Sequence, residues 1–187
     1  KKPMMDAGIL DATELGIIGS LLFYTYAIGK LTNGFLADRA NIAKFMSTGL
    51  FISAIVNLIF GFTTTFWVFA ILWAINGWFQ SMGSAPAVVS VTQWFSNKER
   101  GTYYGIWAAS HNIGEGLTFI GTATVISIWG WRAGFIVPGA ICFIVAIILS
   151  KTLQDRPETY GLPNVFDFKG EKSQKQKTKK SIKDFQL

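Results

Sequence analysis

The chain has 187 residues, of which 50% are hydrophobic and 15% aromatic, and its formal net charge is +6. The positive charge is concentrated in the polar, lysine-rich residues 151–187, so it does not argue for a nucleic-acid-binding protein. Residues 15–150 contain several nearly charge-free runs of about 20 residues, the length that a membrane-spanning helix needs. The composition therefore argues against a soluble domain and predicts an all-α membrane protein.

The N-terminal residues 1–14 are polar and are expected to lie outside the cytoplasm. Within them, Asp11 and Glu14 have the three-residue spacing of a capping box, in which each side chain accepts a hydrogen bond from the other's backbone. A helix is therefore expected to start directly after Asp11. The sequence shows no signal peptide, and we expect it to begin within a longer protein.

Five apolar segments follow, and each is long enough to be a membrane span. They are residues 15–36, 45–62, 67–91, 101–128 and 133–150. The third segment contains Gly83 and Pro86, which allow a kink. We predict that residues 15–150 form five transmembrane helices of one bundle and that residues 151–187 form a largely flexible cytoplasmic loop.

Lysine and arginine gather in alternate loops of this arrangement. They follow the first, third and fifth spans, as Arg39, Lys44, Lys98, Arg100, Lys151 and Arg156. The opposite loops contain only Arg132, and Lys1 and Lys2 are the exception to the pattern. Because basic loops stay in the cytoplasm, the pattern places the C-terminal tail inside and the N-terminus outside. An odd number of spans with an outside N-terminus predicts that one more span precedes this chain.

Ionisable side chains stand out in the fourth span. His111 is the only histidine of the chain, and Glu115 follows it by one helical turn. Tyr104 and Trp107 precede His111 by two turns and one turn, so all four side chains project from one helical face. Ionisable groups at membrane depth are costly and usually face a cavity or a partner, so this face is the predicted wall of a site.

Several blocks of sequence resemble the organophosphate:phosphate antiporters of the major facilitator superfamily, which include glycerol-3-phosphate and hexose-6-phosphate transporters. The blocks are GWFQ at 77–80, WFSNKERG at 94–101, Trp107, HNIG at 111–114, and DRPE with GLP at 155–163. The resemblance covers nearly the whole chain, as helices 2–6 of a twelve-helix transporter and the start of its central loop. Two departures bear on substrate choice: Gly114-Glu115 stands where the family often has Gly-Gly, and the surroundings of Pro86 differ.

The resemblance implies roles for residues of a substrate site. Lys30 matches a lysine that attracts the anionic substrate, with snorkelling to lipid headgroups as the alternative. His111 would donate to a phosphate oxygen, unless it is a packing histidine, and imidazole changes charge near neutral pH. Glu115 would pair with Lys30 or His111 or bind substrate hydroxyls, or else form a structural ion pair. The aromatic residues that would line the cavity, or serve only for packing, are Tyr26, Tyr104 and Trp107.

Charged residues at two loops resemble the family's conformational latch. Asp38 and Arg39 form the polar turn after the first span, and the second group is Lys98, Glu99 and Arg100. The alternative for the turn is a solvated surface pair, which is common and weak.

The function that the resemblance implies is secondary active transport of an organophosphate in exchange for inorganic phosphate, by alternating access. The chain would work in a bacterial inner membrane with the first helix and the C-terminal bundle of the full transporter. No catalytic triad, cofactor motif or metal-ligand cluster is visible, so the chain is not expected to be an enzyme or to hold a cofactor. A membrane sensor for external sugar phosphate and a purely structural membrane subunit remain as alternatives.

Overall fold

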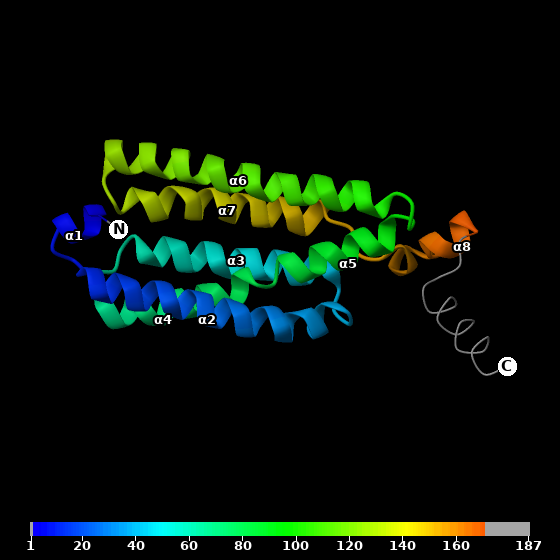
Figure 1. The fold of residues 1–187 in the computed structure, drawn as a ribbon, viewed down its shortest axis with the longest axis horizontal. Coiled ribbons are helices and arrows are strands. Elements are labelled where there is room, and N and C mark those ends of the chain that lie inside the picture. The colour runs from blue at the N-terminus through cyan, green and yellow to red at the C-terminus, as the bar shows by residue number, and fades with distance from the viewer. Residues whose placement is uncertain (1, 171–187) are drawn as a thin grey trace.

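The computed structural model describes residues 2–170, and these residues form helices joined by short loops. The helices are α1 (Lys2–Asp6), α2 (Ala12–Ala37), α3 (Ile42–Phe60), α4 (Phe66–Gln80), α5 (Ser84–Trp94), α6 (Arg100–Trp129), α7 (Ala133–Thr152), the 3-10 helix η1 (Pro157–Tyr160) and α8 (Val165–Lys169). The long helices run alongside one another, with α1 at one end of the bundle and α8 at the other (Figure 1). We name these the α1 end and the α8 end.

Four of the predicted spans correspond to single helices, namely α2, α3, α6 and α7, whereas the third is divided into α4 and α5. Proline explains the division. In a continuous helix, the nitrogen of Pro86 would have to donate to the carbonyl of Met82, and proline has no N–H. The chain instead makes turns at residues 81–83 and restarts at Ser84.

A side chain from α2 supplies partners at this break. Asn33 is 1% exposed, and its Nδ2 donates to Ser81 Oγ at 2.7 Å and to the Trp78 carbonyl at 3.3 Å. Polar groups released by a broken helix at membrane depth need such protein partners, because lipid cannot supply them. The division of the third span is therefore a stabilised feature of the bundle.

Among the described residues, three helices are long and apolar enough to cross a membrane by length and composition: α2, α3 and α7. Helices α4 and α5 have 15 and 11 residues, so each falls short of a full span on its own. Helix α6 has 30 residues, but its apolar side chains alternate with glycine, serine, threonine and the ionisable His111 and Glu115. The count of five spans therefore stays a prediction.

The most extensive helix packing joins α3 to α7 and α2 to α4, with α3 also against α4. Helix α5 contacts α2, α3 and α6, and α6 contacts α7. Glycine permits the close approach of α2 and α4, because a Cβ at Gly77 would lie 2.3 Å from Thr25 Oγ1 and 2.5 Å from the Leu22 carbonyl oxygen.

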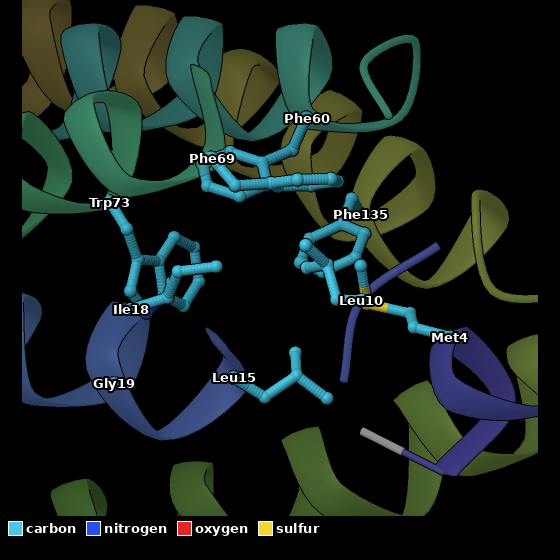
Figure 2. A pocket seen from close by; sticks show the side chains of 9 residues that line it. All are labelled: Met4, Leu10, Leu15, Ile18, Gly19, Phe60, Phe69, Trp73 and Phe135. Atoms are coloured by element: carbon cyan, nitrogen blue, oxygen red, sulfur yellow. The ribbon is translucent and has the colours of Figure 1, made fainter. Parts of the chain in front are cut away.

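An aromatic cluster forms the core at the α1 end. The ring of Phe60 lies 5.0 Å from Phe69, 4.7 Å from Trp73 and 5.3 Å from Phe135, measured between centroids. These side chains line a cavity of about 120 Å³ (Figure 2), together with Met4, Leu10, Leu15, Ile18 and Gly19. The cluster joins α3, α4 and α7 at one level of the bundle.

The N-terminal segment contributes to this core, which its polar composition did not indicate. Met4 of α1 is 6% exposed and Leu10 is 4% exposed, and both pack on the aromatic cluster. The predicted capping box is confirmed: Glu14 N donates to Asp11 Oδ1 at 2.7 Å, and Asp11 N donates to Glu14 Oε2 at 2.9 Å. At the other terminus, α7 extends to Thr152. Of residues 151–187, predicted to be a largely flexible loop, residues 151–170 are described and include η1 and α8, whereas residues 171–187 lie outside the described part of the chain.

Candidate functional site

Two of the predicted site residues lie on α2. Lys30 is exposed, and its Nζ stands 5.8 Å from the ring centroid of the half-buried Tyr26, a cation–π distance. Lys30 precedes the end of α2 at Ala37 by seven residues, which is about 10 Å of helix. The ammonium group is therefore placed well inside the bundle's length, measured from the α8 end.

The other predicted site residues lie on α6, which is one uninterrupted helix. The rings of Tyr104 and Trp107 are 5.4 Å apart between centroids, so the predicted shared face holds for this pair. His111 and Glu115 continue along that face and are exposed. None of the residues of α6 is buried within the described part of the chain. The imidazole and the carboxylate are thus available to a ligand or to another protein segment.

Both groups of residues lie within their helices and not at the helix ends. His111 follows the start of α6 at Arg100 by eleven residues, or about 16 Å, compared with about 10 Å for Lys30 from the end of α2. Both helices contact α5, which brings α2 and α6 to the same neighbour. Across residues 2–170, no ion pair joins Glu115 to Lys30 or His111. The pairing considered for Glu115 is therefore not formed in this structure.

The predicted latch residues near the α5–α6 turn make specific contacts. Glu99 accepts hydrogen bonds from Ser96 Oγ at 2.7 Å and from Lys169 Nζ of α8 at 2.9 Å. These two interactions, the Ser96 bond first, lower the pKa of Glu99 from 4.5 to about 2. Glu99 therefore stays ionised at neutral pH and ties α8 to the turn, while Lys98 is exposed beside it.

Arg100 is held by backbone carbonyls, not by a carboxylate. Its Nη2 donates to the Thr92 carbonyl at 2.8 Å and to the Phe95 carbonyl at 3.4 Å. Its guanidinium carbon lies 5.4 Å from the ring centroid of Phe166 on α8. These contacts close the end of α5 and give α8 a second attachment.

The α8 side of this turn encloses a cavity of about 490 Å³. Its wall is mostly aromatic and proline side chains, with Glu99 and Lys169 among the lining residues. The residues of the cavity are Trp94, Phe95, Glu99, Tyr103, Pro157, Leu162, Pro163, Val165, Phe168 and Lys169. None of the predicted substrate residues lines this cavity.

Asp38 and Arg39, the other predicted latch residues, are exposed at the end of α2. Within residues 2–170 neither side chain forms an ion pair, so no ion pair joins them to Lys98, Glu99 or Arg100. Instead, the backbone carbonyl of Asp38 accepts a hydrogen bond from Arg156.

The sequence analysis missed the contacts of Asp155 and Arg156 with the α2–α3 turn. Asp155 is 6% exposed, and its Oδ1 accepts from the backbone N–H of Ile42 at 2.8 Å. Its neighbour Arg156 donates from Nη2 to the Ala37 carbonyl at 3.1 Å. An acid–base pair immediately after an apolar span was visible in the sequence, but its distant partners were not.

The chemistry available at these positions is ion binding and hydrogen bonding. Among the described residues, no group of three or more histidine, cysteine, aspartate or glutamate side chains is placed to hold a metal ion. An exposed ammonium, an imidazole and a carboxylate suit the reversible binding of a polar, charged solute.

The sequence profile of the Major Facilitator Superfamily matches residues 3–183. The chain belongs to the Major Facilitator Superfamily. The facilitator fold is also found by structural comparison: a bacterial homologue of the human lysosomal transporter Spinster, in an inward-facing and unoccupied conformation, superposes with a TM-score of 0.67. That match has 21% identity and covers 83% of this chain and 38% of the other, so it supports the fold alone.

Curated relatives agree with the resemblance to organophosphate transporters. The chain is 44% identical over 161 residues to a probable hexose phosphate transport protein of Chlamydia muridarum, covering 86% of this chain and 35% of that protein. It is 34% identical over 177 residues to the glycerol-3-phosphate transporter of Bacillus subtilis, covering 90% and 39%. It is also 38% identical over 162 residues to the membrane sensor protein UhpC of Escherichia coli, covering 87% and 37%.

Two conclusions follow for this facilitator protein. The chain is an integral multi-pass membrane protein of a transport family, and not an enzyme. It covers only part of the length of these curated relatives: 35% of the Chlamydia muridarum protein, 39% of the Bacillus subtilis protein and 37% of UhpC.

Proposed function

We propose that the chain forms part of a transporter that takes up an organophosphate, a hexose phosphate or glycerol-3-phosphate, in exchange for inorganic phosphate. The names of the relatives support a phosphate ester as solute. The observation that carries the proposal is that Lys30 and His111 are both exposed and lie on two helices that share α5 as a neighbour. A cation and a hydrogen-bond donor at membrane depth suit a dianionic phosphate, because charge-assisted hydrogen bonds to phosphate are strong.

The proposed mechanism is alternating access, in which two helical bundles rock about a site near the midplane. Lys30 and His111 would bind the phosphate group, with Tyr26, Tyr104 and Trp107 beside them. Glu115 would compete with the solute for the cationic groups, because unpaired charges at membrane depth are expensive. Asp38 and Arg39, with Lys98, Glu99 and Arg100, would hold one conformation at the α8 end. The remaining partners are the lipid bilayer, an additional first helix and a C-terminal bundle.

The proposed setting is a bacterial cytoplasmic membrane with the α8 end inside. The basic residues of the alternate loops support this orientation, because the turns that contain Arg39, Lys98 and Arg156 all lie at the α8 end. Figure 1 shows these turns at the same end of the bundle.

The test is solute exchange by the full-length protein in phosphate-loaded proteoliposomes. Labelled hexose 6-phosphate and glycerol-3-phosphate should enter only when phosphate is present inside, and external inorganic phosphate should compete. Binding of a sugar phosphate without any uptake would instead favour the sensor function, which the likeness to UhpC keeps as the second candidate. Absence of both binding and uptake would leave the structural-subunit alternative.

A further inference from the structure

The C-terminus of α2 and the N-terminus of α3 are connected by a short turn, which lies at the α8 end of the bundle. Every helix end leaves unpaired backbone groups, carbonyls at the C-terminus and N–H groups at the N-terminus. At the end of α2, Arg156 donates to the carbonyls of Ala37 and Asp38. At the start of α3, the Ile42 N–H donates to Asp155 Oδ1 at 2.8 Å. Asp155 and Arg156, which are adjacent in sequence, thus provide hydrogen-bond partners for the two helix ends that this turn connects.

The charges of this pair match the two helix ends. A helix C-terminus carries partial negative charge and a helix N-terminus partial positive charge, so guanidinium and carboxylate each meet the favourable end. The capping groups come from far along the chain, because Asp155 and Ile42 are 113 residues apart, and Arg156 and Ala37 are 119 apart. The pair therefore connects the segment after α7 to the turn between α2 and α3.

The carboxylate of Asp155 is also held from other directions. Its Oδ2 accepts from Asn41 Nδ2 and from Thr159 Oγ1, both at 2.8 Å. The backbone carbonyl of Asp155 accepts a hydrogen bond from Nε1 of Trp94, at the end of α5, at 2.7 Å. Asn41 cannot turn its amide round without cost, because its Oδ1 already caps α3 by accepting from Lys44 N at 2.9 Å. The acceptor character of both Asp155 oxygens is therefore required.

We infer that Asp155 and Arg156 are positioning residues that fasten the ends of α2, α3 and α5 to the segment after α7. These three helix ends and the segment after α7 then move as one body during a conformational change, and the exposed side chains of Asp38 and Arg39 are presented in a fixed turn. The part of this inference that concerns transport rests on the proposed function. The part that concerns the turn rests on the contacts alone.

The first test is limited trypsin digestion at Arg39, which is exposed in the turn. The variants Asp155→Asn and Arg156→Lys are made in the full-length protein in detergent, and size-exclusion chromatography verifies that they are folded. Asp155→Asn replaces one acceptor oxygen with an NH2 group, which then faces other hydrogen-bond donors. Arg156→Lys keeps the positive charge but replaces the planar guanidinium, which has several donors in a fixed arrangement, with an ammonium group. Cleavage at Arg39 should become about tenfold faster in Asp155→Asn, because the turn opens locally more often.

The matched control is Glu158→Gln, which makes the same charge change on an exposed residue of η1. Its cleavage rate at Arg39 should equal that of the unmodified protein. Unchanged cleavage at Arg39 in both folded positioning variants would overturn the inference. This arm does not depend on any transport activity.

The second test compares exchange kinetics in proteoliposomes. Asp155→Asn should lower the maximal exchange rate about tenfold with an unchanged KM for the organophosphate, because the solute-binding residues are elsewhere. Faster cleavage with an unchanged exchange rate would overturn the positioning role and leave only a local cap. If the unmodified protein exchanges nothing, the proposed function fails, and the digestion result still decides whether the pair fastens the turn.

Discussion

Lys169 Nζ lies 2.9 Å from Glu99 Oε1, and this ion pair joins α8 to the α5–α6 turn. Both side chains are well exposed, 43% and 41%, so solvent screening leaves the pair little weight in the overall stability. Its consequence is positional, because it fixes a short helix against a turn that also contains Lys98 and Arg100.

The first prediction concerns the pH dependence of this attachment. The pKa of Glu99 in the folded protein, about 2, lies below its ordinary value of 4.5, so the attachment is fully present above pH 4.5 and is lost as the pH falls towards 2. Spin labels at Phe168 and Thr102 should keep one separation between pH 7 and pH 5. Glu99→Gln should broaden the distance distribution already at pH 7, whereas Glu158→Gln should not. A separation that widens between pH 7 and pH 5 in the unmodified protein would contradict the assignment.

The second prediction concerns the cationic groups of the proposed site. Lys30→Ala and His111→Ala should each weaken organophosphate binding to the full-length protein by about 10- to 100-fold, the range for a lost charge-assisted hydrogen bond. Lys44→Ala is the control, because it removes the same charge from an exposed position in the first turn of α3. Isothermal titration in detergent gives the affinities. Equal affinities for Lys30→Ala and Lys44→Ala would assign Lys30 to lipid headgroups instead.

The third prediction separates two roles of Glu115. If the carboxylate competes with the solute, Glu115→Gln binds the organophosphate as tightly as the unmodified protein or more tightly, while exchange slows. The physical reason is that the empty carrier then retains unbalanced positive charge at membrane depth. Affinity and counterflow rate are measured on the same preparation. A loss of affinity as large as that of Lys30→Ala would make Glu115 a direct ligand of substrate hydroxyls.

The fourth prediction concerns the contact between α2 and α4. Gly77→Ala should lower the free energy of unfolding by about 1–3 kcal/mol, because the added methyl group meets the backbone of α2 and overpacks the interface. Gly116→Ala is the control, since a Cβ there has nothing within 4 Å among the described residues. Thermal unfolding in one detergent compares the two variants. A melting temperature for Gly77→Ala at or above that of Gly116→Ala would show that the helices separate without cost.

The fifth prediction concerns orientation in the membrane. In a background that lacks Cys142, the chain's one cysteine, single cysteines are introduced as Thr64→Cys and Lys98→Cys, both at exposed loop positions. A membrane-impermeant maleimide added to intact cells should label the first and spare the second. Both should react after permeabilisation, which controls for accessibility. Labelling of Lys98→Cys alone in intact cells would reverse the proposed orientation.

Local sequence patterns predicted much of this fold. The all-α class follows from long apolar runs, and the capping box of Asp11 and Glu14 depends on residues only three apart. The shared face of Tyr104 and Trp107 follows from helical periodicity in the same way. Each of these features depends on residues within one or two helical turns of each other, so it can be predicted from the pattern of a single sequence.

Contacts between distant segments were not predictable from the same patterns. The hydrogen bond between Asp155 and Ile42 joins residues that are 113 positions apart, and the sequence near either residue does not indicate its partner. The packing of Met4 and Leu10 on the core was likewise not predicted, because both residues lie in a segment that was interpreted as polar. For the proposed site, the spacing of His111 and Glu115 could be predicted, whereas their placement relative to Lys30 depends on the packing of α5 between two helices.

The division between α4 and α5 has a consequence for biosynthesis. The two helices would measure about 22 Å and 16 Å, and neither alone crosses a hydrocarbon layer of about 30 Å. The insertion machinery would therefore have to accept them as one unit, with the turns at residues 81–83 between the two helices. Asn33 of α2 is synthesised before Trp78 and Ser81, so the side chain that donates hydrogen bonds at the break precedes the break in the order of synthesis.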